Sequence, residues 1–281
     1  MDASLNKELQ KLALEIRIGI VEEIQARGFG HIGGSLSLAD ALAVLYGAVM
    51  RYDSQNPKWP DRDKLVCSKG HAGPGVYATL AVKGFFPYED LKTLNQPGTY
   101  LPSHCDKNKT PGVDMTTGSL GQGTSAAVGI ALGDRLKGRD SRTYLLVGDG
   151  ESDEGQVWEA AMSAAKYHLD NLCAVVDVNG LQIDGATKDV MPSEPLDQKF
   201  AAFNWNVIHV DGHDYDALIA AFEAAAACKG KPTVLIAKTT KGKGVSFMEN
   251  NAGWHGKAPN AEQYEQAKAE LSAQIAELEV Q

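Results

Sequence analysis

Cysteine is scarce in this sequence, and the few that occur lie far apart. The four residues, Cys67, Cys105, Cys173 and Cys228, include no CxxC pair. Such spacing argues against a zinc site and against a disulfide framework. We therefore expect reduced thiols in a cytoplasmic protein.

The sequence also lacks an excess of positive charge and any long apolar stretch. The sequence has 27 Lys and Arg against 36 Asp and Glu, a net charge of −9, and no basic cluster offsets it, so we expect no nucleic-acid partner. No apolar stretch approaches membrane-spanning length, and the N-terminus lacks the apolar core of a secretory signal. The remaining composition is that of an ordinary soluble protein, and residues 1–281 fit one large α/β domain.

Apolar residues recur with two periods along the chain. Positions 5–26 form an amphipathic helix pattern, and Ser37 with Asp40 predicts a capping box for a helix running to Val49. Further helices are expected at 119–136, 151–168, 215–227 and 261–279, the last as a C-terminal tail. Strands are expected at 65–67, 144–147, 172–176, 206–210 and 233–237. This alternation predicts an α/β fold, a parallel sheet with helices on both faces.

Polar residues follow two of these strands where each one ends. Gly148-Asp149-Gly150 follows the strand at 144–147, and Asn179 follows the strand at 172–176. A helix between parallel strands makes a βαβ crossover, which brings both ends to the ligand-binding edge of the sheet. Carboxylate and amide oxygens suit Mg²⁺, and the glycines allow backbone N–H groups to approach an anion. The pattern favours a magnesium-diphosphate site over an ordinary βαβ unit with a glycine-rich turn.

A Gly-Asp-Gly followed about thirty residues later by an asparagine resembles the signature of thiamine diphosphate enzymes. The resemblance implies Asp149 and Asn179 as side-chain ligands of Mg²⁺ and Leu181 as a carbonyl ligand, with Ca²⁺ or Mn²⁺ as possible replacements. The second asparagine of the motif is Gly180 here. Some branches of the family also lack it, so the metal site is still expected.

Five further motifs resemble those of transketolase and occur in family order. They are FGHIGGS at 29–35, SKGHA at 68–72, LPSH at 101–104, TTGSLGQG at 116–123 and GWHG at 253–256. The resemblance covers about residues 10 to 260, but only the N-terminal, diphosphate-binding part of that family. It implies transfer of a two-carbon ketol group between sugar phosphates, with His31, His71, His104 and His255 as catalytic residues. Cofactor contacts are implied at His71, Gly118, Leu120, Gly148, Asp149, Gly150, Glu154, Asn179, Ile183 and His255.

The resemblance also implies a partner. A complete transketolase carries a pyrimidine-binding domain and a C-terminal domain that follow this segment. We therefore expect one subunit of a split transketolase that assembles with the missing domains as α₂β₂. The glutamate that activates the cofactor is expected on the partner, and the sequence does not specify the ketose or the aldose.

Competing interpretations remain at this point. They are the alpha subunit of a 2-oxo acid dehydrogenase, a deoxyxylulose-phosphate synthase, and a non-catalytic homologue that binds the cofactor. Gly28 to Gly33 satisfy GxGxxG but follow a helix, so nicotinamide binding is not expected. Glu154 is explained equally well as a favourable charge in the first turn of a helix. Structural roles are expected for His168, His209 and His213. The basic loop that contains Lys238, Lys241 and Lys243 is interpreted either as a phosphate contact or, at least as well, as a solvated surface loop.

Overall fold

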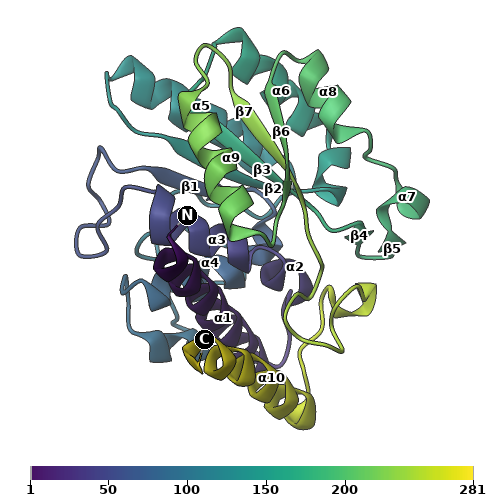
Figure 1. Ribbon diagram of the computed structural model, residues 1–281. Coiled ribbons are helices and arrows are strands. Elements are labelled where there is room, and N and C mark those ends of the chain that lie inside the picture. The colour runs from purple at the N-terminus through teal and green to yellow at the C-terminus, as the bar shows by residue number, and fades with distance from the viewer. Residues whose placement is uncertain (1, 281) are drawn as a thin grey trace.

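The computed structural model describes residues 2–280, so Met1 and Gln281 of the expected domain lie outside the described residues. Within that range five parallel strands form one sheet in the order β1-β2-β3-β7-β6. Figure 1 shows this sheet in the upper part of the molecule. Each expected strand is confirmed, with ends shifted by two residues at most. The bounds are β1 Lys64–Cys67, β2 Thr143–Gly148, β3 Leu172–Val178, β6 Asn206–Asp211 and β7 Thr233–Lys238, with a small antiparallel pair at β4 Leu181–Gln182 and β5 Gly185–Ala186.

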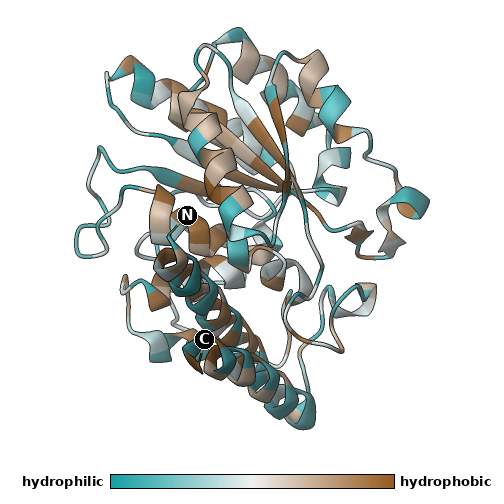
Figure 2. Cartoon of the chain, viewed as in Figure 1, coloured by the Kyte–Doolittle hydropathy of each residue, from teal (hydrophilic) through white to brown (hydrophobic). Residues whose placement is uncertain are grey.

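Helices cover both faces of the sheet, as expected. Because neighbouring strand residues point to opposite faces, Tyr144 and Leu146 pack on one side while Leu145 and Val147 pack on the other. In Figure 2 the strands are predominantly hydrophobic, in keeping with burial on both faces. The first side is covered by α1 Ala3–Arg27, α3 Ala39–Val44, α4 Gly73–Val82 and α9 Tyr215–Ala227. The second is covered by α5 Gln122–Leu136, α6 Gly155–Lys166 and α8 Leu196–Ala202.

The first and last helices pack antiparallel in the lower part of the molecule (Figure 1). Ion pairs join Lys11 of α1 to Glu279 of α10 Ala261–Val280 at 2.8 Å, and Lys268 to Glu22 at 2.9 Å. Both pairs are partly exposed and contribute little individually. The predicted apolar face of α1 is buried, and it consists of Leu9, Leu12, Ile16, Ile20 and Ile24.

The predicted capping box at Ser37 and Asp40 is wrong. A short helix, α2 Gly33–Leu36, precedes Ser37, while α3 gives way to a π-helical turn at Leu45–Val49. The Ser37 hydroxyl donates to the Asp177 carboxylate at 2.7 Å instead of capping a helix. Ser37 also has helical backbone angles, φ −64° and ψ −28°, whereas an N-cap residue is extended, so this position does not begin a helix.

The crossover helix also begins later than the predicted residue 151. Gly150–Asp153 form a 3₁₀ turn and α6 starts at Gly155. The cause is Glu151, whose buried carboxylate accepts hydrogen bonds from Ser68 Oγ and the Gly121 and Gly148 amides. The other short elements are 3₁₀ turns at Gly70–Ala72, Tyr88–Thr93 and Ala252–Trp254, and α7 Thr187–Val190.

Two expectations from composition can be compared with the described part of the chain. Between residues 2 and 280, no helix has the length and apolar character needed to cross a lipid bilayer. The four cysteines are free thiols, and Cys67, Cys105 and Cys173 are buried. Burial raises the pKa of Cys105 and of Cys173 to about 12, so both remain protonated near neutral pH.

Candidate functional site

A cleft with about 640 Å³ of empty volume opens at the carboxyl ends of the central strands. This is the edge where parallel α/β sheets bind ligands. Nine of the residues expected in the site line the cleft, namely His71, Leu120, Gly148, Asp149, Gly150, Asn179, Leu181, Ile183 and His255. The βαβ crossover therefore places the two ends of the motif together, as its spacing predicted.

Asp149 lies at the turn that follows β2 and is almost fully buried. Its carboxylate accepts hydrogen bonds from the Gly150 amide at 2.8 Å and the Gly180 amide at 2.6 Å. Burial, followed by the nearby charge of Asp177, raises the pKa of Asp149 to about 6. The negative charge of this carboxylate is thus incompletely compensated within the protein, and a cation in the cleft would stabilise it.

Asn179 follows β3, with its side-chain amide held at both ends. Its Nδ2 donates to Asp177 at 3.0 Å, and its Oδ1 accepts from the Leu181 amide at 3.1 Å. Within residues 2–280, no group of three or more His, Cys, Asp or Glu side chains is arranged to hold a metal ion. A metal in this cleft would therefore depend on amide and carbonyl oxygens beside the one carboxylate of Asp149.

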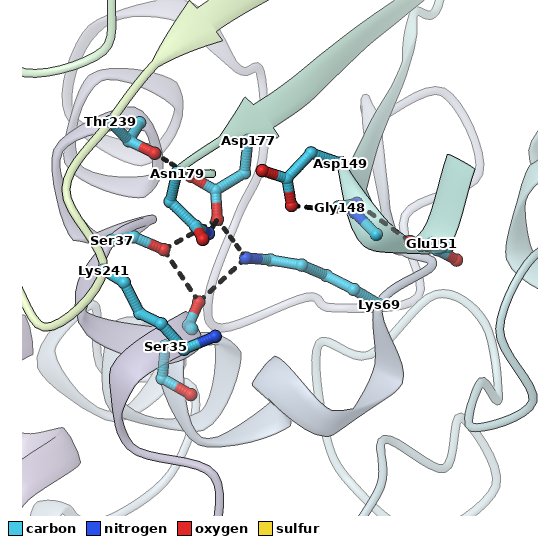
Figure 3. A network of polar contacts seen from close by, with 12 residues as sticks. Ser35, Ser37, Lys69, Gly148, Asp149, Glu151, Asp177, Asn179, Thr239 and Lys241 are labelled. Carbon is cyan, nitrogen blue, oxygen red and sulfur yellow. Dashed lines mark hydrogen bonds and ion pairs between the residues drawn. The ribbon is translucent and has the colours of Figure 1, made fainter. Parts of the chain in front are cut away.

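A buried carboxylate, Asp177, holds two residues that line the cleft, Lys69 and Asn179. Figure 3 shows Ser37, Lys69, Asn179 and Thr239 directed at it from four separate segments. Burial opposes its charge, but the Lys69 ammonium and the hydrogen bonds hold the pKa of Asp177 below its usual value. Asp177 was not among the residues predicted for the site. Its position at the end of β3, two residues before Asn179, was the available signal.

Lys69 and Glu151 complete this buried network, and the sequence analysis missed both. Besides Asp177, the Lys69 ammonium donates to the Gly34 carbonyl at 2.9 Å. Glu151 ties the glycine-rich turn to the start of α5. Both residues stand close in sequence to motif residues, His71 and Asp149, in chain segments that end at the same sheet edge. Lys and Glu are usually exposed, so the sequence alone did not indicate that these two side chains are buried.

The four expected histidines come together from four loops that are distant in sequence. The ring centroids of His31 lie 5.3 Å from His71, 5.4 Å from His255 and 6.3 Å from His104, and His71 lies 5.0 Å from His255. Burial is the main cause that lowers the pKa of His31 and of His71, and it lowers that of His255 to about 4. These three rings are therefore neutral near pH 7, and each can accept a proton at one nitrogen while it donates a hydrogen bond from the other.

Of the two interpretations of the basic loop, the solvated surface is wrong for Lys241, which lines the cleft. Its side chain is 2% exposed and enters the cleft, with Nζ 3.0 Å from His255 Nδ1 and 3.4 Å from the Leu181 carbonyl. Burial, and then repulsion from Lys69, lowers its pKa to about 8. Two buried cations, Lys69 and Lys241, thus line the same cleft as Gly148 and Gly150, which makes the cleft suitable for an anion.

The remaining expected residues lie outside the cleft lining or at its rim. The His31 ring adjoins those of His71 and His104, and a Cβ placed on Gly118 would meet the His104 ring at 3.6 Å. Glu154 is exposed and precedes α6, beside Gly121. Ile183, although it lines the cleft, is 64% exposed at its rim.

Comparison with known proteins agrees with this geometry. The family model described as the transketolase, thiamine diphosphate binding domain matches residues 9–280. A protein named 6-deoxy-6-sulfo-D-fructose transketolase subunit SqwG, from Clostridium sp. strain MSTE9, is 52% identical over 94% of this chain and 96% of its own length. A protein of Phocaeicola vulgatus, named as one of the subunits of an apulose-4-phosphate transketolase, is 43% identical over 92% of each chain.

Solved structures show the same fold. The transketolase of Campylobacter jejuni superposes with a TM-score of 0.89 at 32% identity, and the match covers 99% of this chain. It covers 46% of the Campylobacter protein, so this chain spans less than half the length of that relative. The chain belongs to the transketolase family, in which it corresponds to the thiamine diphosphate-binding domain.

Proposed function

We propose that this chain is the diphosphate-binding subunit of a transketolase, with residues 1–281 forming one domain. The reaction transfers a two-carbon ketol group from a ketose to an aldose. The observation that carries the proposal is the gathering of four imidazoles, from four distant segments, beside the cleft that holds Asp149 and Asn179. The metal motif by itself would also suit the alpha subunit of a 2-oxo acid dehydrogenase.

The cleft fits thiamine diphosphate and a divalent cation. Asp149, Asn179 and the Leu181 carbonyl would hold Mg²⁺, which prefers such oxygen ligands and completes its shell with phosphate oxygens and water. The raised pKa of Asp149 supports this assignment because a bound cation would stabilise the charged carboxylate. A side chain at Gly150 is disfavoured, since its Cβ would lie 3.0 Å from that of Gln182.

Lys241 is the group of this chain best suited to contact the diphosphate. Its ammonium lies inside the cleft, and its pKa of about 8 leaves most of the population charged at pH 7. An approaching anion would stabilise the charged form further. We also assign the remaining cofactor contacts to His71, Gly118, Leu120, Glu154, Ile183 and His255.

The chemistry contributed by the cofactor, when bound, is a nucleophilic carbon and an electron sink for carbon–carbon cleavage. The histidines then have the task of moving protons at substrate oxygens. The neutral rings of His31 and His255 lie edge to face with their centroids 5.4 Å apart, so either ring can accept a hydroxyl proton and, once charged, return it to a substrate oxygen. Partial burial of these two rings limits the access of bulk water to them.

We further propose that the substrates are sugars with a terminal anion and that a partner subunit completes the enzyme. Two relatives that match along nearly their whole length are named as subunits, one for a sulfonated ketose and one for a sugar phosphate. The partner would bring the pyrimidine-binding domain, and the assembly would be α₂β₂. Either terminal anion, a phosphate or a sulfonate, is compatible with the chemistry at the reacting carbonyl.

The decisive experiment is reconstitution of this chain with its partner subunit, thiamine diphosphate and Mg²⁺. A ketose phosphate or a sulfonated ketose is supplied as donor and ribose 5-phosphate as acceptor. We expect a product two carbons longer than the acceptor. Decarboxylation of a 2-oxo acid without ketol transfer would contradict the proposal and favour the dehydrogenase alternative.

A further inference from the structure

His213 connects two parts of the protein that the cofactor motifs do not include. It lies in the loop between β6 and α9, and both ring nitrogens are engaged. Nδ1 lies 2.6 Å from an oxygen of Asp40, and Nε2 accepts a hydrogen bond from the Thr240 amide at 2.8 Å. The side chain of His213 is 16% exposed, so these contacts are largely shielded from water.

The two contacts fix the protonation state of the ring. Thr240 presents an N–H donor, so Nε2 must carry a lone pair. The Asp40 carboxylate is an acceptor, so Nδ1 must carry the proton. His213 is therefore a neutral imidazole in a single tautomer, and it links a carboxylate on one side to a backbone amide on the other.

Asp40 is a rigid anchor for this ring. Arg17 donates to both of its oxygens, at 3.0 and 2.5 Å, and the Tyr215 hydroxyl donates to it as well. Asp40 and Arg17 are both buried. Burial alone would raise the pKa of Asp40, but Arg17 and His213 hold it well below its usual value, so the carboxylate is charged at any physiological pH.

The other side of the ring faces the loop that carries Lys241 into the cleft. Thr240 directly precedes Lys241, and the loop is held further by Thr239, which donates to Asp177, and by the Gly242 amide, which donates to the Gly33 carbonyl at 3.0 Å. These bonds fasten the chain on both sides of Lys241. The Thr240 amide is the point where the loop depends on a side chain from outside the cleft.

We propose that His213 is a positioning residue that holds the 239–242 loop so that the Lys241 ammonium stays in the anion-binding part of the cleft. The consequence for anion affinity rests on the proposed function, in which Lys241 contacts the diphosphate. The effect of His213 on the position of the 239–242 loop does not depend on the proposed function. The two can therefore be measured separately on the full-length chain.

Two conservative variants separate the contacts of His213. In His213→Asn the side-chain Nδ2 can still donate to Asp40, but nothing reaches Thr240. In His213→Gln the longer amide can present Oε1 to Thr240, but the donor to Asp40 is lost. His209→Asn is the matched control, because His209 is an exposed histidine on β6 whose contact is with Asp197 at 3.3 Å.

Hydrogen–deuterium exchange of the peptide covering residues 239–244 is the direct readout. We expect exchange about 3- to 10-fold faster in His213→Asn than in the wild type, as for the loss of one hydrogen bond, and near-normal exchange in His213→Gln and His209→Asn. Equal exchange in His213→Asn and the wild type would overturn the proposal. Exchange as fast in His213→Gln as in His213→Asn would do the same, because the Asp40 contact would then be responsible.

Calorimetric titration with inorganic pyrophosphate and Mg²⁺ supplies the second readout. We expect His213→Asn to bind pyrophosphate about 3- to 10-fold more weakly, as for the loss of one hydrogen bond, and Lys241→Met to bind it more weakly still. Unchanged affinity in Lys241→Met would remove Lys241 from the proposed diphosphate contacts, while the exchange result would still decide the role of His213. Unchanged affinity in His213→Asn alone, with Lys241→Met impaired, would show that the loop holds Lys241 without His213 and would overturn the positioning role.

Discussion

At the scale of single residues, Asp149 combines two properties that are usually separate. It is buried, yet its pKa of about 6 shows that the fold does not stabilise its charge fully. A structural ion pair would show the opposite shift, as Asp177 does beside Lys69. The contrast between these two neighbouring carboxylates indicates which one is satisfied by the protein and which one is available to a ligand.

We predict that Asp149→Ala abolishes metal-dependent cofactor binding and leaves the fold intact. The change removes a buried charge but leaves the Gly150 and Gly180 amides without their acceptor, so the free energy of unfolding should fall by about 1–3 kcal/mol. Titration of thiamine diphosphate with Mg²⁺ into the assembled complex measures the affinity, and urea unfolding measures the stability. Undiminished affinity would place the metal elsewhere.

We predict that His104→Ala lowers ketol transfer by roughly 10²-fold or more, the usual scale for a lost proton-transfer group. His104 does not line the cofactor cleft but lies 6.3 Å from the His31 ring, so thiamine diphosphate affinity should change little. His255→Ala should lower turnover to a similar degree. Steady-state kinetics test this with the exposed His209→Ala as control, and full turnover in the His104 variant would refute its assignment.

His255 should also make stability depend on pH. Its folded pKa is about 4, below the unfolded value of 6.5, so the unfolded state binds more protons between these values. Its contribution to stability is therefore fully present above pH 6.5 and falls as the pH drops toward 4. Urea unfolding at pH 7.5 and 5 should show a smaller loss in His255→Gln than in the wild type. An identical loss in both proteins would argue that His255 is not the group responsible.

At the scale of secondary-structure elements, α5 depends on close contact near its first turn. A Cβ on Gly123 would lie 2.6 Å from Ser68 Cα, which is backbone and cannot move aside, whereas a Cβ on Gly133 meets nothing within 4 Å. Both positions belong to the same helix, which makes them a matched pair. Close packing against Ser68 requires glycine at position 123, whereas the surroundings of Gly133 leave room for a side chain.

We predict that Gly123→Ala destabilises the chain by about 1–3 kcal/mol, because α5 must shift away from the end of β1. Gly133→Ala should instead stabilise it by about 0.5–1 kcal/mol through the higher helix propensity of alanine. Urea unfolding of both variants measures the difference. Equal effects at the two positions would show that propensity, and not packing, governs this helix.

Elements were predicted well where the signal was local and poorly where a distant residue intervened. The strand at 233–237 and the helix at 215–227 needed nothing beyond apolar periodicity, and both are confirmed. The capping box at Ser37 failed because Ser37 adopts helical backbone angles while its hydroxyl donates to Asp177, 140 residues away. The start of α6 moved because Glu151 turns toward the Gly121 and Gly148 amides.

At the scale of the whole molecule, exposed apolar side chains lie at the rim of the cleft and in the segment that follows. Ile183 at its rim is 64% exposed, and Val190 and Met191 after it are exposed as well. Apolar residues clustered beside a functional cleft favour an interaction site. The proposed partner subunit, with its pyrimidine-binding domain, would cover these side chains.

We predict that the purified chain is catalytically silent by itself and becomes active when its partner subunit is added. The carboxylate that activates the cofactor is expected on that partner, and one end of the cofactor would otherwise be unheld. An assay with thiamine diphosphate, Mg²⁺ and both sugar substrates, run with and without the partner, decides the matter. Robust turnover by the chain alone would show that the split-subunit proposal is wrong.

The sequence by itself determined the order of strands and helices and the two strand ends that meet in the cleft. Both follow from local periodicity and from the rule that a βαβ crossover makes its strands parallel. Tertiary structure alone decided which charged residues are buried. Lys69 and Lys241 look like surface lysines in the sequence, and Asp177 looks like an ordinary strand residue. Their burial depends on partners brought together from distant segments, and no local pattern encodes such distances.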